Sequence, residues 1–261
     1  MKKNKTLKRE RVNRALESIL DYPLTIVEAP IGYGKTTAVR EFLAAVRVPV
    51  IWTSFLSEDD TAEAFWNRLA ADIGSLDETA GIRLKSLGIP TDAPQLATII
   101  SILSEMDYRP DTTLVIDDFH LAKSMRVTAL FRRFVSEMAE DFHIVFITRD
   151  MSNLDIAELS AKGLCNILPQ QTLRFTVEEI RAYCALMGFR PGEDGLKRVV
   201  EYTDGWISLA YLILLGMEQG IPVGRNSAID ELVEKVLYDA YDEPIQKFLL
   251  RLSVMDAFTA R

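Results

Sequence analysis

Residues 29–37 read APIGYGKTT, and the segments on both sides of them indicate what this turn does. The β-branched, apolar segment 25–29 predicts a short strand before the turn, and the apolar spacing over 38–43 predicts a helix after it. Gly32 and Gly34 allow successive backbone N–H groups to curl around an anion, and the helix N-terminus adds its positive dipole end. A glycine-rich turn between a strand and a helix therefore predicts a phosphate-binding loop.

The residues inside this turn predict separate contacts to a nucleotide. Lys35 would reach the β- and γ-phosphates, the Thr36 hydroxyl would hold Mg²⁺, and Thr37 would contact the α-phosphate. The usual pattern GxxxxGK[ST] has a glycine where this chain has Ala29, but the part that surrounds the phosphates, from Gly32 to Thr36, is intact. The alternative is a strand–helix turn that contains Gly-Lys-Thr by chance.

Two adjacent carboxylates follow a second strand-like segment. The segment 112–117 predicts a strand with Asp117 at its carboxyl end, beside the loop. A phosphate loop needs a carboxylate in that position to hold its metal ion, and we assign this role to Asp117. Asp118 would then point toward the γ-phosphate, where its carboxylate would polarise the attacking water. The alternative is a strand that ends in a solvated Asp-Asp turn.

A third strand end carries a cation. The segment 143–148 predicts a strand, and Arg149 follows it. There the guanidinium would face the γ-phosphate from the side opposite the two aspartates. It would distinguish ATP from ADP, or stabilise the negative charge that develops during phosphoryl transfer. A salt bridge at the strand end is the alternative. His120, close behind the two aspartates, is interpreted as a loop residue rather than a catalyst.

The nucleotide expected at this site is ATP or ADP with Mg²⁺. GTP-binding proteins recognise the guanine base through an Asn/Thr-Lys-x-Asp motif, and this sequence contains no such motif. The chain between Lys35 and Asp117 includes another strand-like segment, 48–55. This spacing is typical of the P-loop proteins in which a further strand separates the loop from the carboxylate along the chain.

The order of strands and helices predicts an α/β fold with a five-stranded parallel sheet flanked by helices. A weaker strand is expected at 165–168, and near-continuous apolar strands suit a parallel sheet covered on both faces. Ser57, with Asp60 three residues later, is expected to open one helix, and Thr91 or Asp92 to open another. We assign residues 1–170 to this nucleotide-binding domain.

Beyond residue 170 the sequence predicts helices alone. Thr176 and Glu179 form a capping-box pattern before an apolar helical stripe, and two more helices are expected at 196–202 and 206–217, broken at Gly205. We assign 171–224 to a small helical lid. Residues 226–241 predict an amphipathic helix, and 225–261 would be the start of a winged-helix subdomain that the end of the sequence truncates.

Composition excludes several classes of protein. The chain has 261 residues, of which 48% are hydrophobic and 26% charged, with a net charge of −8. This argues against autonomous DNA or RNA binding, because no broad basic surface is available for a phosphate backbone. The first 14 residues hold seven basic side chains and are expected to form a solvated tail. Two cysteines exclude a disulfide framework, and neither a membrane-spanning run nor a secretory signal is present, so a cytoplasmic protein without membrane contact is expected.

Six segments together resemble a known family, the MalT-like, LuxR-family large ATP-binding transcriptional regulators of the STAND class of signal-transduction NTPases. The phosphate loop alone is generic, but the ordered set is specific and covers the chain from about residue 10 to 258. The segments are 29–37, 117–120 (DDFH), 148–149 (TR), 173–179 (LRFTVEE), 205–206 (GW) and 248–254 (FLLRLSV).

The resemblance implies a function that composition does not. In this family a nucleotide domain, a lid and a winged-helix domain precede an inducer-sensing superhelix and a C-terminal helix-turn-helix. ADP would hold a resting form, ATP and a small-molecule or protein inducer would drive self-association, and slow hydrolysis would reset the switch. DNA would be bound through the C-terminal domain, which this sequence lacks. The residues carried over are Gly32, Tyr33, Gly34, Lys35, Thr36 and Thr37 for the phosphates, Asp117 for the metal, Asp118 for the water and Arg149 for the sensor.

One departure and several alternatives stay open. The family commonly has Gly-Trp-Pro in the lid, and this chain has Gly205-Trp206-Ile207, which puts a proline contact to the nucleotide in doubt. The main alternative function is an AAA-type ATPase that acts as a motor or in DNA processing. A small-molecule kinase and a scaffold that does not hydrolyse ATP fit less well, since the helices after residue 170 have no arginine cluster and Lys35, Thr36 and Asp117 are intact.

Overall fold

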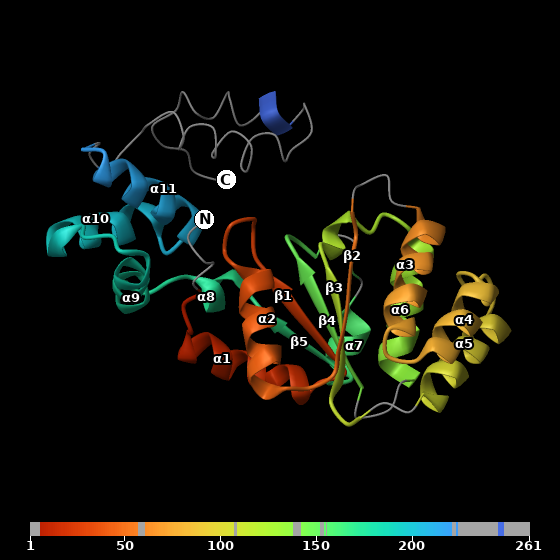
Figure 1. Cartoon of the computed structure of the whole chain (residues 1–261). Coiled ribbons are helices and arrows are strands. Elements are labelled where there is room, and N and C mark those ends of the chain that lie inside the picture. The colour runs from red at the N-terminus through yellow and green to blue at the C-terminus, as the bar shows by residue number, and fades with distance from the viewer. Residues whose placement is uncertain are drawn as a thin grey trace. The chain divides into compact units, whose positions relative to one another are not determined.

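The computed structural model describes residues 6–56, 61–106, 109–137, 142–151, 154, 156–220, 223 and 245–247. The contacts within the chain separate two compact units, with the boundary between Leu173 and Arg174. Figure 1 shows an α/β unit, formed by residues 8–173, and a helical unit whose described helices follow Arg174.

The α/β unit is built on a five-stranded sheet in the order β2-β3-β4-β1-β5. Every pair of neighbouring strands is parallel. This confirms the predicted parallel sheet and places β4 between the strand that leads into the loop and the strand that carries the aspartates. The strands are β1 (Leu24–Glu28), β2 (Val50–Ser54), β3 (Thr112–Asp117), β4 (Phe142–Thr148) and β5 (Cys165–Leu168).

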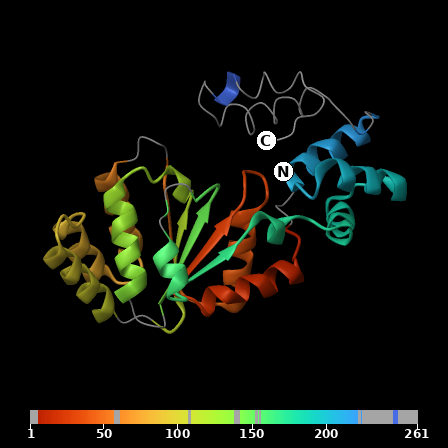
Figure 2. The same ribbon diagram turned by 180° about the vertical axis from the view of Figure 1, so that it is seen from behind.

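Helices cover both faces of the sheet, which is why β3 and β4 are buried along their whole length. Figures 1 and 2 show α1 and α2 on one side and α3 to α6 on the other. Alternate strand residues such as Leu24 and Ile26 join a large apolar cluster with Phe65 and Phe131 on the second side. The elements around the sheet are α1 (Glu10–Leu16), η1 (Glu17–Leu20), α2 (Lys35–Val46), α3 (Ala62–Gly74), α4 (Glu78–Leu87), α5 (Ala93–Glu105), η2 (Phe119–Leu121), α6 (Met125–Glu137), α7 (Ala157–Ala161) and α8 (Gln170–Leu173).

The helices between β2 and β3 differ in part from the prediction. The expected helix start at Ser57, with Asp60, lies outside the described residues. Among the described residues, α3 begins at Ala62 and is capped by Thr61, whose hydroxyl accepts a hydrogen bond from the Ala64 N–H. The start of α5 after Asp92 is confirmed by the same kind of cap. Sequence reasoning missed α4, although Asp77 caps its first turn.

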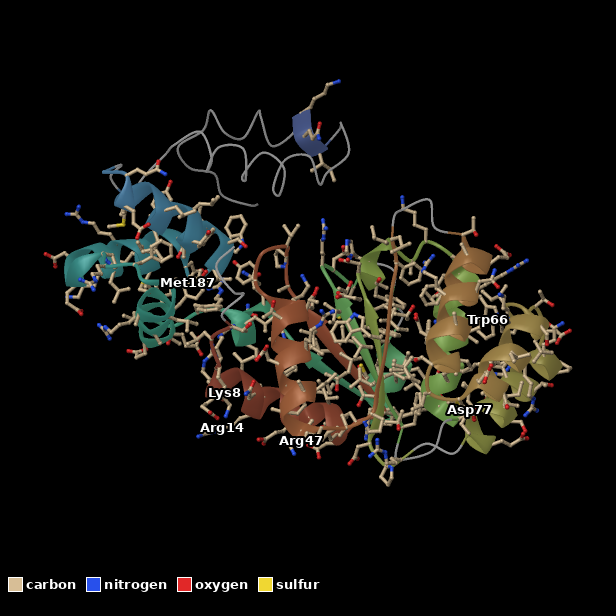
Figure 3. All side chains as sticks on the ribbon, viewed as in Figure 1. Lys8, Arg14, Arg47, Trp66, Asp77 and Met187 are labelled. Carbon is tan, nitrogen blue, oxygen red and sulfur yellow. The ribbon has the colours of Figure 1, made fainter. Side chains whose placement is uncertain are left out.

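Helices α3 and α4 pack closely through a buried tryptophan and small residues. Figure 3 labels Trp66 on α3 and Asp77 before α4. Trp66 is 2% exposed, and its indole N–H donates a hydrogen bond of 2.9 Å to the Leu84 carbonyl. Buried indole N–H groups need such a partner, and this one ties the two helices together.

The basic N-terminal segment is not a solvated tail where the structure describes it. Residues 10–16 form α1, which buries Val12 and Leu16, and Arg9 is 7% exposed. The Arg9 Nη2 atom donates to the Leu173 carbonyl at 2.8 Å, and Arg11 Nη1 donates to the Thr172 carbonyl at 2.9 Å. A count of charges does not reveal these contacts. The last carbonyl groups of a helix have no hydrogen-bond donor within that helix, and arginine guanidinium groups can donate to them.

The described helices of the second unit are α9 (Val177–Met187), α10 (Gly192–Thr203) and α11 (Ile207–Glu218). The predicted capping box is confirmed, since Thr176 and Glu179 exchange hydrogen bonds of 3.2 Å between side chain and backbone. The predicted break at Gly205 is also present. Gly205 has a φ of +74°, and a Cβ there would lie 2.6 Å from the Phe175 carbonyl oxygen, so the break requires glycine.

The expected winged-helix start, 225–261, lies outside the described residues apart from 245–247, which form a helical turn. The predicted helix 226–241 is not among the described residues. In the part of the chain that is described, no helix combines the length and apolar character needed to cross a membrane.

The contact between α3 and α4 yields a stability prediction. A Cβ on Gly81 would lie 2.5 Å from the Gly74 Cα and 2.8 Å from the Ala70 carbonyl oxygen, so Gly81→Ala must push the helices apart. We expect a loss of about 1–3 kcal/mol in the free energy of unfolding, measured by urea denaturation. Gly74→Ala is the matched control, because its Cβ would meet the nearest atom at an ordinary 3.5 Å. Equal stability of the two variants would contradict the close packing.

Candidate phosphate-binding site

The turn after β1 has the backbone that a phosphate loop needs. Gly32 and Gly34 have φ values of +83° and +77°, a region that residues with a Cβ rarely adopt, and Gly34 is the N-cap of α2. Ala29, where the usual pattern has glycine, is completely buried, and its N–H donates to the Thr148 carbonyl of β4 at 3.3 Å. The methyl group is therefore accommodated in the core, and the loop runs directly into the N-terminus of α2.

The Lys35 ammonium group lies inside the loop. Its Nζ donates to the carbonyl oxygens of Ala29 at 2.6 Å and Pro30 at 3.1 Å. Burial lowers the pKa of Lys35 to about 8. Arg149 lowers this pKa further, while Asp118 and Asp117 oppose the shift. An incoming phosphate would offer this buried cation an anionic partner in place of two neutral carbonyls, which is a favourable exchange.

Asp117 lies within reach of the loop, although β4 separates its strand from β1. Its Oδ1 atom accepts a hydrogen bond from the Thr36 hydroxyl at 3.2 Å and another from the Asp118 backbone N–H at 3.0 Å. The residue is 8% exposed, and burial is the largest of the effects that raise the pKa of its carboxyl. The pairing predicted from the sequence, a threonine hydroxyl and a carboxylate at one point, is present in the structure.

This oxygen pair suits a magnesium ion. Mg²⁺ prefers hard oxygen donors and is usually held by one or two carboxylates together with phosphate oxygens and waters. Thr36 and Asp117 supply one hydroxyl and one carboxylate 3.2 Å apart. No group of three or more His, Cys, Asp or Glu side chains that could hold a metal occurs among the described residues.

Asp118 and Arg149 lie at the edge of the site. Asp118 has a left-handed backbone, with φ +53°, and its side chain is half exposed. Arg149 is exposed directly after β4 and acts electrostatically on both Lys35 and His120, which places its charge close to them. Figure 1 shows the ends of β1, β3 and β4, which carry these residues and the loop, at one edge of the sheet.

The structure adds a residue that sequence reasoning missed. The Gln170 side-chain amide donates a hydrogen bond of 2.6 Å to the Tyr33 hydroxyl, and Tyr33 is 8% exposed within the phosphate loop. Gln170 begins α8, the helix whose carbonyls accept from Arg9 and Arg11. No pattern in the sequence signals this contact, because the two partners are 137 positions apart.

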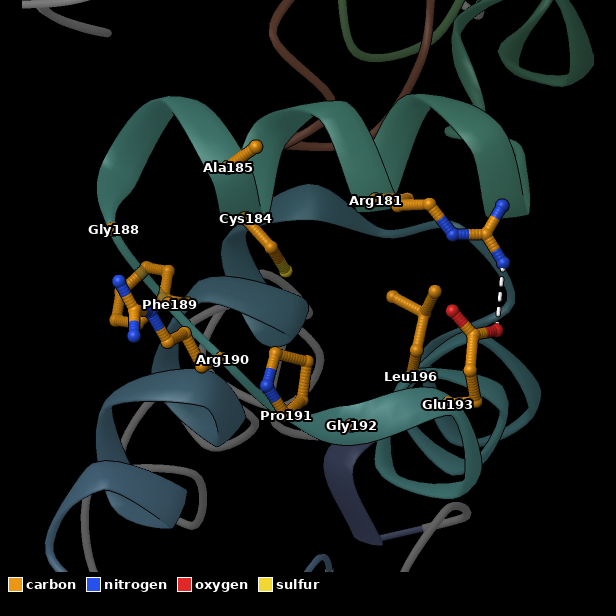
Figure 4. Close-up of a pocket in the computed structure, with 10 residues that line it drawn as sticks. All are labelled: Arg181, Cys184, Ala185, Gly188, Phe189, Arg190, Pro191, Gly192, Glu193 and Leu196. Carbon is orange, nitrogen blue, oxygen red and sulfur yellow. Dashed lines mark hydrogen bonds and ion pairs between the residues drawn. The ribbon is translucent and has the colours of Figure 1, made fainter.

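A separate hollow of about 580 Å³ lies in the helical unit, between α9 and α10 (Figure 4). Its lining is mostly apolar, with an ion pair of 2.9 Å between Arg181 and Glu193. The Cys184 thiol is buried there and has a pKa raised by burial, so it is protonated and poorly nucleophilic at neutral pH. The one carboxylate of the hollow, that of Glu193, is paired with Arg181, and Lys35, Thr36 and Asp117 are not among the residues that line it.

Comparison with known proteins supports the family suggested by the motifs. The chain is 28% identical to the HTH-type transcriptional regulator MalT of Serratia proteamaculans (strain 568), over 96% of its own length and 29% of the relative. It is 29% identical, with the same coverage, to MalT of Yersinia pestis (strain Pestoides F). The chain is thus similar to MalT over nearly its whole length. It spans less than a third of these relatives, and no protein-family model matches it.

The fold is shared with a solved P-loop protein. A Walker-type ATPase of Pyrococcus abyssi superposes with a TM-score of 0.54 over 96% of this chain and 77% of the other, at 17% sequence identity. At this identity the likeness concerns the fold alone. This chain therefore shares the fold of that ATPase, and its glycine-rich loop lies between β1 and α2.

The burial of Lys35 predicts how ligand binding depends on pH. A free-state pKa of about 8 means that the ammonium loses its proton as the pH rises above 8, whereas a bound phosphate would keep it protonated. We expect affinity for ATP to be constant from pH 7 to 7.5 and to fall by up to about tenfold per unit above pH 8, measured by titration calorimetry. Lys35→Arg keeps its charge throughout this range and should show a flatter profile. An equally steep fall in that variant would contradict the assignment to Lys35.

Proposed function

We propose that this chain is the ATP- and ADP-binding switch module of a MalT-like transcriptional regulator of the LuxR family. Slow, Mg²⁺-dependent hydrolysis of ATP would reset a self-association that ATP drives. The observation that carries the proposal is the Thr36–Asp117 hydrogen bond beside a glycine-rich loop, in a chain similar to MalT over 96% of its length. The hydrogen bond and the loop support nucleotide binding, and the similarity to MalT supports a role in a transcriptional regulator.

The residues of the loop would bind the phosphates. Backbone N–H groups from Gly32 to Thr37 would surround the phosphate oxygens, as at other helix N-termini. Lys35 would move from its two carbonyl partners to the β- and γ-phosphates. Thr36 and Asp117 would hold Mg²⁺, which supplies positive charge to the phosphate oxygens where negative charge develops during transfer.

Two residues would act on the γ-phosphate. The Asp118 carboxylate is half exposed at the site and would accept the proton of the attacking water. Arg149 would contact the γ-phosphate through its guanidinium, so that ATP and ADP make different contacts with the protein. Such a difference is what a switch requires, because a ligand shifts a conformational equilibrium only through contacts that differ between two states.

The remaining parts of the proposal concern the whole regulator. Self-association on binding ATP and an inducer, and DNA binding through a C-terminal domain, follow from the resemblance. The domain boundaries at 170 and 224, the lid, the winged-helix start and the cytoplasmic location stay predictions. An ATPase motor is the alternative, since a P-loop fold serves both switches and motors.

Loss of the loop cation provides the direct test of nucleotide binding. Lys35→Ala removes a charge-assisted interaction with the phosphates, and we expect ATP affinity to fall about tenfold to a hundredfold. Titration calorimetry with ATP and ADP measures the change. Lys85→Ala, at an exposed position of α4, is the matched control and should bind as the wild type does. Equal affinity in wild type and Lys35→Ala would exclude the proposed site.

Replacement of the candidate base tests the switch. Asp118→Asn keeps the shape of the side chain but cannot accept a proton, so we expect ATP binding within about twofold of wild type and turnover lowered about 10²–10⁴-fold. The ATP-loaded form should then accumulate, and light scattering should show more self-association with ATP.

The same turnover assay separates a switch from a motor. Unchanged turnover in Asp118→Asn would remove this residue from the catalytic role. A wild-type rate of about 1 s⁻¹ or more, stimulated by DNA, would favour the motor.

A further inference from the structure

Tyr33 is a buried side chain in the middle of the phosphate loop. It is 8% exposed and lies between Gly32 and Gly34, whose φ values of +83° and +77° give the loop its curvature. Ile31, on the other side of Gly32, is 40% exposed. A Cβ on Gly34 would meet no described atom within 4 Å beyond its chain neighbours. Because glycines leave the backbone many accessible conformations, the shape of this loop depends strongly on how Tyr33 is held.

Gln170 holds Tyr33 through a short hydrogen bond. Its side-chain amide donates to the Tyr33 hydroxyl at 2.6 Å, and the pair is partly buried. The sheet brings the two residues together. Strand β5 pairs in parallel with β1, and Leu168 lies opposite Val27, so the segments that follow these strands leave the sheet at the same edge. The loop follows β1, and Gln170 follows Leu168 by two residues.

The helix that carries Gln170 is anchored at its other end. Leu173, the last residue of α8, is 1% exposed, and its carbonyl accepts a hydrogen bond from Arg9 at 2.8 Å. The Thr172 carbonyl accepts another from Arg11 at 2.9 Å. Gln170 is therefore a donor on a segment that is fixed within the α/β unit, and its bond to the loop restricts where the loop can move.

We propose that Gln170 is a positioning residue for the phosphate loop, which acts through the Tyr33 hydroxyl and keeps the loop in its phosphate-accepting conformation before a nucleotide binds. The inference rests on the proposed binding of ATP and ADP. A site that already has its bound shape binds more tightly, because the cost of ordering the loop is not subtracted from the binding free energy. When only a fraction of the molecules has the competent loop, the apparent Kd is the intrinsic Kd divided by that fraction.

This role predicts the same effect on both nucleotides. ATP and ADP share the phosphates that the loop would surround, whereas Arg149 would contact only the γ-phosphate of ATP. A loosened loop therefore weakens the binding of both nucleotides by one factor and leaves the ratio of their Kd values unchanged. A constant ratio separates positioning of the loop from recognition of the γ-phosphate.

Two single variants test the role of the hydrogen bond. Tyr33→Phe and Gln170→Leu each remove one partner with little change in side-chain shape, and we expect the Kd for ATP and for ADP to rise about three- to tenfold in each, measured by titration calorimetry. Gln171→Leu is the matched control, because it makes the same replacement at the next, exposed position of α8 and should bind as the wild type does. Unchanged or tighter binding in the two variants would overturn the proposal, as would a changed ratio of the two Kd values.

A double-mutant cycle tests whether Gln170 acts through Tyr33. The variant that combines Tyr33→Phe with Gln170→Leu should bind ADP within about twofold of the weaker single variant, because the hydrogen bond is already lost in each. Multiplied losses would mean that the two side chains act independently, and would overturn the proposal.

Hydrogen exchange reports on the loop without any nucleotide. The Ala38 N–H donates to the Gly34 carbonyl at 2.9 Å, so its exchange rate depends on the geometry at the end of the loop. In the ligand-free protein we expect this amide to exchange at least about threefold faster in Gln170→Leu than in the wild type, and at the wild-type rate in Gln171→Leu. Equal rates in all three proteins would overturn the proposal. A wild type that binds neither nucleotide would instead contradict the proposed function, so the two failures are distinguishable.

Discussion

The hydrogen bond between the Thr36 hydroxyl and Asp117 Oδ1 joins two segments that are 81 positions apart in the sequence, and the candidate site depends on it. One partner lies in the first turn of α2 and the other at the last position of β3. They meet because β1 and β3 run parallel on either side of β4, which brings their carboxyl ends to one edge of the sheet. Loops at this edge are where ligands bind in open α/β sheets.

Burial destabilises the charged forms of two side chains at this edge. Lys35 and Asp117 are both withdrawn from water, and burial is the largest influence on each pKa, lowering that of the lysine and raising that of the carboxyl. Each charge is thus less stable than it would be in water, and a phosphate with its magnesium ion would compensate both. The aromatic core under η2 holds the following residues, Asp118 and His120, at the same edge.

The contacts of α8 connect this site to the rest of the α/β unit. Gln170 contacts Tyr33 in the loop, and the carbonyls at the end of α8 accept hydrogen bonds from Arg9 and Arg11. The next residue along the chain, Arg174, begins the helical unit. The phosphate loop, the N-terminal helix and the segment that leads into the second unit are therefore parts of one hydrogen-bonded arrangement.

Much of the site could be predicted from the sequence because its motifs are local. The glycine-rich turn, the strand ending in Asp117 and the capping box at Thr176 each depend on residues within a few positions, whose backbone preferences and spacing are visible in the chain. The strands could also be predicted from local sequence, because short runs of β-branched residues bounded by polar residues are typical of strands. Helix α4 was missed because its apolar residues are few, and packing against α3 stabilises it.

Contacts between segments that are distant in the sequence were decided by the tertiary structure alone. The insertion of β4 between β1 and β3, the contact of Gln170 with Tyr33 and the burial of Arg9 all join distant segments. The stacking of Phe119 on Phe146 of β4 is of the same kind, since it joins η2 to a strand further along the chain. Sequence periodicity indicates which face of an element is apolar, but which other element covers that face depends on the shape and packing of the whole core.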